Sequence, residues 1–132
     1  MSQRVPMQSI PPGIIHDPVT PFTKDNEVDL ATFERVIEFR ARVQRGLDRV
    51  VRDVRSGANI AVVTSAGPIG VAVGLTFGAS EHHMIRTSSV IRNASITELR
   101  FRSQDFDWHP ERVALIAFNS IHHLPPELHT EY

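Results

Sequence analysis

The chain has 132 residues, no cysteine and a formal net charge of −1. This length and an apolar content of 41% suit one ordinary domain with a hydrophobic core. A charge this close to zero predicts no nucleic-acid partner and no membrane partner, and the lack of cysteine excludes disulfides, thiolate metal sites and a cysteine nucleophile. No apolar stretch of the signal-peptide kind follows Met1–Pro6, so we expect a cytoplasmic protein.

Residues 9–22 are predicted to be extended. They contain four prolines, each without a backbone N–H, which is too many for a central strand. A polar turn follows at 24–27, and Asp29 is expected to cap a helix that begins at Leu30.

Apolar residues then recur at helical spacing as far as Val54. This pattern predicts either one helix to about Arg55 or two helices joined near Phe39-Arg40. The other side of this helical stretch carries arginines and acids at i,i+4 spacing, and the interleaved acids favour a solvated face over a polyanion-binding stripe. The pairs are Glu38/Arg42, Asp48/Arg52 and Arg49/Asp53.

The centre of the chain, residues 59–78, is predicted to form a strand, a tight turn and a helix. Residues 60–64 are apolar and β-branched, which predicts a strand covered on both faces, and Pro68 suits the first turn of a helix that continues to Leu75. The turn between them, Ser65-Ala66-Gly67, offers backbone N–H groups at a positive helix end. It is therefore the candidate phosphate-binding site, although many α/β proteins have such a turn for packing only.

The same stretch contains no charge from Ala58 to Ala79, and Gly70, Gly74 and Gly78 follow the spacing of close helix contacts in membranes. Polar residues within the stretch and Gly67-Pro68 at its middle oppose a membrane span. We expect instead that the glycines let the helix lie close against a sheet.

The last third of the chain is predicted to complete the sheet. Its expected elements are a short helix from Ser80 to Arg86, extended residues 88–91, a strand over 94–102, a polar loop over 104–111, a strand over 112–118 and a tail without regular structure from Pro125. The fold expected from all these elements is α/β, a partial three-layer sheet with helices.

The histidines do not predict a metal site, because no H-x-x-x-H or H-x-H spacing occurs. A cluster of His123, Glu127 and His129 on a loop is the weaker alternative. Ser65 lies at a strand-to-helix turn but lacks the G-x-S-x-G setting of an esterase nucleophile. We therefore expect no metal and no cofactor, and the sequence identifies no catalytic residue.

Four stretches share their order and spacing with a known family. They are Arg40 to Arg49, Val62 to Ile69, Asn93 to Leu99, and Phe118-Asn119 with His123-Leu124. Over residues 39–132 the chain resembles the C-terminal half of the histidine phosphatase superfamily, the phosphoglycerate mutase-like proteins. The resemblance implies an α/β domain that acts on phosphate monoesters through a phosphohistidine.

Three features of that family are missing from this chain. Ser65 stands where the family turn has a phosphate-binding histidine, no Arg-His-Gly motif supplies the nucleophile, and the glutamate that acts as general acid belongs to the half that is absent. The resemblance therefore implies a catalytically incomplete protein that binds a phosphate-bearing small molecule through Ser65, Ala66 and Gly67, with Arg92 or another arginine nearby.

Residues 10–38 carry a second resemblance, through Gly13-Ile14-Ile15, Val19 to Thr23, Asp25-Asn26-Glu27 and Val28-Asp29-Leu30. They resemble the first strand and helix of the dihydrodipicolinate synthase family of TIM-barrel Schiff-base lyases. The catalytic lysine and tyrosine of that family have no counterpart here. The predicted division is thus 1–38, lyase-like, and 39–132, phosphatase-like.

Three functions follow from these observations. The first is a histidine phosphatase-like protein that acts on or binds phosphate monoesters, the second is a non-catalytic anion-binding or self-associating module, and the third is a lyase fragment. Loss of the family's neighbouring strands would leave an edge of residues 60–64 open, to be paired by residues 14–19 or by a second copy in a homo-oligomer.

Overall fold

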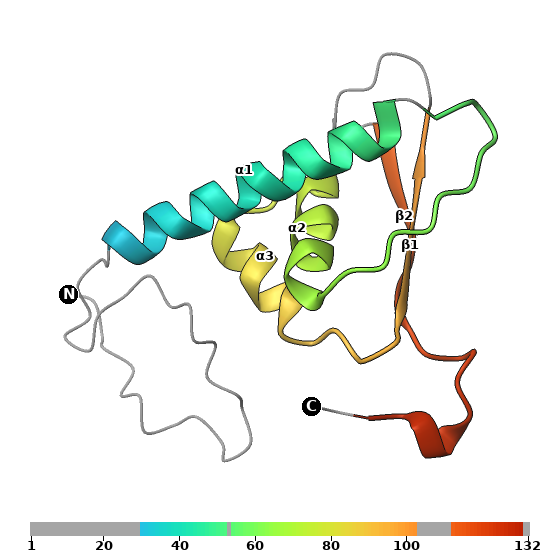
Figure 1. Ribbon diagram of the computed structural model, residues 1–132. Helices are drawn as coiled ribbons and strands as arrows, with labels where there is room; N and C mark the ends of the chain where they lie inside the picture. The colour runs from blue at the N-terminus through green and yellow to red at the C-terminus, as the bar shows by residue number, and fades with distance from the viewer. Residues whose placement is uncertain (1–29, 53, 103–111, 131–132) are drawn as a thin grey trace, which may run out of the picture.

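A computed structural model describes residues 30–52, 54–102 and 112–130, and shows a mixed α/β fold. All three helices lie on one side of a two-stranded antiparallel sheet (Figure 1). The elements in chain order are α1 (Leu30–Arg52), α2 (Ala66–Thr76), α3 (Glu81–Ser88), β1 (Ile96–Phe101), β2 (Val113–Ser120) and a 3₁₀ turn, η3 (Pro126–Leu128).

The first helix, α1, is a single helix of 23 residues that ends at Arg52. The alternative of two helices joined near Phe39 is therefore wrong. One face of α1 packs on the core through Phe39, Val43 and Leu47, and the arginines of the opposite face are exposed, as predicted. The expected cap, Asp29, lies outside the described residues. The helix runs unbroken through the predicted junction at 38–39, and the division into two domains stays a prediction.

The predicted second helix is confirmed, and α2 is the centre of the fold. It contacts α1, α3 and β2, and its residues from Gly70 to Thr76 are buried. The end of α2 is fixed by Gly78, whose φ of 61° is easy for glycine. There the Ala79 N–H donates to the Gly74 carbonyl at 2.8 Å and the Gly78 N–H donates to the Leu75 carbonyl at 3.3 Å, which caps the last turn.

Gly70 and Gly74 of α2 face α3 and not the sheet. The expectation that these two glycines let the helix lie close against a sheet is therefore wrong, because the close neighbour is another helix. A Cβ at Gly70 would lie 2.6 Å from the Met84 carbonyl oxygen, and one at Gly74 would overlap the Met84 side chain. The small residues therefore allow α2 and α3 to pack closely. No helix within the described ranges is long and apolar enough to cross a membrane.

The helix α3 begins after Ser80, as predicted, and ends two residues later than predicted. Residues 88–91 are not extended, because the Ser89 N–H donates to the Ile85 carbonyl at 3.2 Å and continues the helical turn. Both C-terminal strands are confirmed, with Phe101 opposite Val113 in the pairing of β1 with β2. The tail contains one 3₁₀ turn, η3, where no regular structure was expected.

The predicted strand at residues 60–64 is wrong, since the segment is irregular and exposed. Val63 is fully exposed, and Val62 and Ile60 are 52% and 43% exposed. The physical reason is the lack of a partner, because no described strand pairs with this segment. The expected third layer is also missing from the described elements, and Ile116 and Phe118 on the outer face of the sheet are exposed.

Candidate functional site

The candidate site is the turn that leads into α2. Ser65 is extended, with φ −95° and ψ 172°, and its side chain makes no capping hydrogen bond. The first intrahelical bond runs from the Ile69 N–H to the Ser65 carbonyl at 3.4 Å, and Pro68 has no N–H to satisfy. The N–H groups of Ala66 and Gly67 therefore lie in the first turn, where a helix supplies no acceptor of its own.

A groove of about 730 Å³ adjoins this turn. Residues 60–66 line one side of the groove and residues 91–99 line the other. Ser65 and Ala66 are in the lining, whereas Gly67 is not. A Cβ at Gly67 would lie 3.1 Å from Cζ of Phe39, so this residue is held against α1. Of the three predicted residues, Ser65 and Ala66 therefore line the groove, and Gly67 lies outside the lining, against α1.

The charge in the groove comes from Arg92 and Glu98. Arg92 is the only cationic residue of the described lining, and it follows the turn that ends α3. Glu98 lies on β1 and forms a long ion pair with Arg100 at 3.9 Å. A guanidinium and a helix N-terminus at one groove favour an anionic ligand.

Asn119 fixes the loop that carries Arg92. Its side-chain oxygen accepts a hydrogen bond from the Arg92 N–H at 2.7 Å, and its side-chain amide donates to the Val90 carbonyl at 2.6 Å. Its own N–H donates to Oγ1 of Thr97 at 3.2 Å. Asn119 has φ 53°, a left-handed conformation that asparagine tolerates better than most residues. The sequence analysis did not give this residue a role, and asparagine at a strand end was the only local signal for one.

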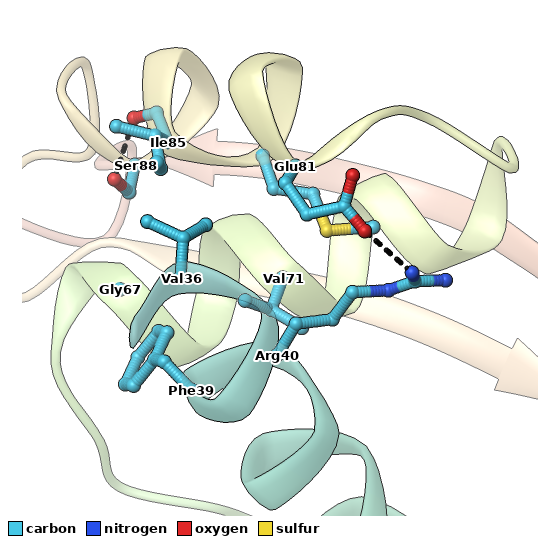
Figure 2. Close-up of a pocket in the computed structure, with 9 residues that line it drawn as sticks. Val36, Phe39, Arg40, Gly67, Val71, Glu81, Ile85 and Ser88 are labelled. Carbon is cyan, nitrogen blue, oxygen red and sulfur yellow. Dashed lines mark hydrogen bonds and ion pairs between the residues drawn. The ribbon is translucent and has the colours of Figure 1, made fainter. Parts of the chain in front are cut away.

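A second hollow, between the three helices, is a packing defect and not a binding site. Its volume is about 30 Å³, roughly that of one water molecule, and its walls include Val36, Phe39 and Val71. Figure 2 shows Arg40 reaching across from α1 to Glu81 on α3, where the two side chains form an ion pair at 2.6 Å.

The histidines of the described ranges do not gather with acids, and no group of three or more possible metal ligands lies together there. The His123, Glu127 and His129 alternative is therefore wrong. His83 and His129 have local partners instead. Nδ1 of His83 lies 2.7 Å from Oγ of Ser80, and Nε2 of His129 lies 3.0 Å from the Leu124 carbonyl.

Comparison with known protein families gives one match. Residues 14–112 match the histidine phosphatase superfamily (branch 1). The match covers most of the chain and includes residues 14–38, and nothing found supports a dihydrodipicolinate synthase segment there. No curated protein and no solved structure matches the chain.

Proposed function

Because the chain belongs to the histidine phosphatase superfamily, we propose that it binds the phosphoryl group of a phosphate monoester at the start of α2 and does not hydrolyse it. The observation that carries this proposal is the uncapped first turn of α2, which opens beside a groove that also contains Arg92. The partner is then a small phosphate-bearing molecule.

Binding at this place needs only groups that the chain already presents. The N–H groups of Ala66 and Gly67 carry the positive end of an 11-residue helix, which attracts an anion. The hydroxyl of Ser65 makes no cap bond, so it is available to donate to a phosphoryl oxygen. The guanidinium of Arg92 adds a charge-assisted hydrogen bond.

Hydrolysis by the mechanism of this family needs a histidine that attacks phosphorus. The 132 residues contain no Arg-His-Gly motif, and no histidine lines the described part of the groove. Glu98 is the one carboxylate of the described lining, and the Ser65 hydroxyl makes no hydrogen bond to it. We therefore assign the groove a binding role, in which the ligand is held and released unchanged.

Calorimetric titration with an aryl phosphate tests the binding role. With one helix end and one arginine as ligands, we expect a Kd on the order of 1 mM. The variant Arg92→Gln should weaken binding about tenfold, since one charged hydrogen bond is lost. Arg92 holds Asn119 through its backbone N–H, so the side-chain change leaves that bond in place.

The matched control is Arg86→Gln, which removes the same charge from the last turn of α3, outside the groove lining. It should bind like the unaltered chain. If both variants weakened binding equally, the loss would come from the change in net charge and not from a contact at the groove, which would contradict the proposed site. Release of the aryl alcohol above background, lost in Ser65→Ala, would contradict the non-catalytic part of the proposal.

A further inference from the structure

The outer side of α1 carries an arginine stripe, made of Arg42, Arg45, Arg49 and Arg52. Spacings of three, four and three residues place the four side chains on one side of the helix, about 15 Å from first to last along its axis. All four are exposed. Figure 1 shows α1 lying across α2 and α3 at the edge of the molecule, so a partner can approach α1 from outside.

The acids near the arginine stripe do not neutralise it. Glu38 and Asp48 each lie four residues before a member of the stripe, Arg42 and Arg52 respectively. Neither spacing produces an ion pair, because the ion pairs of the described residues join α1 to α3 and two residues of β1, and include no member of the stripe. Asp48 is half-buried and lies to the side of the stripe. The stripe therefore presents four positive charges to solvent.

The helix α1 concentrates positive charge that the chain as a whole lacks. It contains six arginines and three acids, a net charge of +3, whereas the whole chain has a net charge of −1. Physiological salt screens exposed charges beyond about 8 Å, so a partner at the stripe is attracted by the charges beside it and not by the total. The total charge thus does not decide what this face binds.

We propose that the arginine stripe binds the phosphate backbone of double-stranded DNA, without regard to base sequence. One strand of B-form DNA presents a phosphate about every 3.4 Å along the helix axis, so the roughly 15 Å of the stripe corresponds to about four phosphates. A guanidinium binds phosphate oxygens through two parallel N–H groups, which the ammonium of lysine cannot do. Four arginines therefore match four phosphates in number, spacing and chemistry.

The surroundings of the stripe favour a DNA duplex over other polyanions. The exposed residues between its members are Gly46 and Val50, so it has no aromatic side chain on which an unpaired base could stack. Ile37 and Val50, the exposed large apolar residues among the described side chains of α1, are not part of it, so the stripe inserts nothing into a bilayer. The major groove of B-form DNA admits a helix, whereas that of an RNA duplex is too narrow.

Fluorescence anisotropy of a labelled DNA duplex of about 20 base pairs, titrated with the full chain at several salt concentrations, tests the proposal. Four phosphate contacts predict a slope of about −3.6 for log K against log salt concentration, so doubling the salt should weaken binding about twelvefold. A second duplex with a shuffled sequence should bind equally, because backbone contacts read no bases. No binding at low salt, or a slope near zero, would overturn the proposal.

The variant Arg49→Gln removes one contact from the middle of the stripe, and glutamine keeps a helix propensity close to that of arginine. It should weaken binding about fivefold and make the salt slope shallower by about 0.9. The matched control is Arg86→Gln, which removes the same charge from the last turn of α3 and should leave the slope unchanged. Equal effects of the two variants would overturn the proposal, and circular dichroism ensures that only folded chains are compared.

Three further measurements separate the stripe from other sites and other ligands. Arg92→Gln should not change binding of the duplex, and a loss confined to that variant would place the DNA at the groove and overturn the proposal. An RNA duplex of the same length should bind more weakly than DNA. Vesicles of phosphatidylcholine with about one-third phosphatidylserine should not bind the chain measurably. Tighter binding of either the RNA or the vesicles than of the DNA would identify a different partner and overturn the proposal.

Discussion

Asn119 shows how one residue can hold the candidate site in place. Its left-handed backbone and its side-chain bonds to Arg92 and Val90 join the end of β2 to the loop after α3, 27 and 29 residues away in sequence. The Val90 carbonyl and the Arg92 N–H, which bond to the Asn119 side chain, belong to a loop that is not paired with a strand. Asn119 is therefore a positioning residue for Arg92.

Substitution of Asn119 separates the backbone and side-chain parts of this role. Asn119→Gly loses the two side-chain bonds, which we expect to lower the free energy of unfolding by about 1–2 kcal/mol. Asn119→Ala loses the same bonds and also places a Cβ in the left-handed region, so it should cost about 1 kcal/mol more. Urea denaturation measures both, and equal stability of the two variants would contradict a strained backbone.

Gly70 is a second residue whose environment decides the outcome of substitution. A Cβ there would lie 2.6 Å from the Met84 carbonyl oxygen and 2.9 Å from the Ser88 nitrogen, both backbone atoms that cannot move alone. Gly70→Ala should therefore destabilise the fold by about 1–3 kcal/mol.

The matched control is Gly46→Ala on α1, where nothing lies within 4 Å of the added methyl group. That variant should stabilise the chain by about 0.5–1 kcal/mol, because alanine favours the helix. Thermal unfolding followed by circular dichroism compares the two, and destabilisation of similar size in both would contradict the close packing of α2 against α3.

At the scale of elements, local signals predicted most of the fold. Apolar spacing predicted α1, Pro68 predicted the start of α2, and Ser80 predicted the start of α3. An imperfect apolar alternation predicted β1 and an apolar run predicted β2. Each of these signals depends only on neighbours in sequence. The turn at Ser65 was predicted for the same reason. The prediction of a strand at residues 60–64 failed because a strand needs a partner strand, and the sequence of those five residues does not show whether a partner is present.

The contact of α1 with α3 includes the ion pair of Arg40 with Glu81. Its side chains are 38% and 22% exposed, so water screens the pair and Glu81→Gln should lower stability by no more than about 1 kcal/mol. The effect should shrink as salt is added. The control is Glu98→Gln, whose ion pair with Arg100 is longer and more exposed, and which should change stability by less than about 0.3 kcal/mol. A larger loss for the control in urea denaturation would contradict this ranking.

At the scale of the whole molecule, α2 joins structure to function. Its buried middle organises the core with Met84 and Val113, and its half-buried first turn, next to the exposed Ser65, presents the candidate site. The arrangement of the site was only partly predictable. Ser65 and Ala66 are adjacent in sequence, whereas the position of Arg92 depends on Asn119 and thus on contacts across the fold.

The central claim is that the first turn of α2 holds a phosphoryl group. The most direct measurement is a titration of the ¹⁵N-labelled chain with inorganic phosphate, followed through the amide signals of Ala66 and Gly67. The account predicts that both signals shift and saturate together, and that Arg92→Gln weakens the response while Arg86→Gln does not. Unchanged Ala66 and Gly67 signals at saturating phosphate would contradict it.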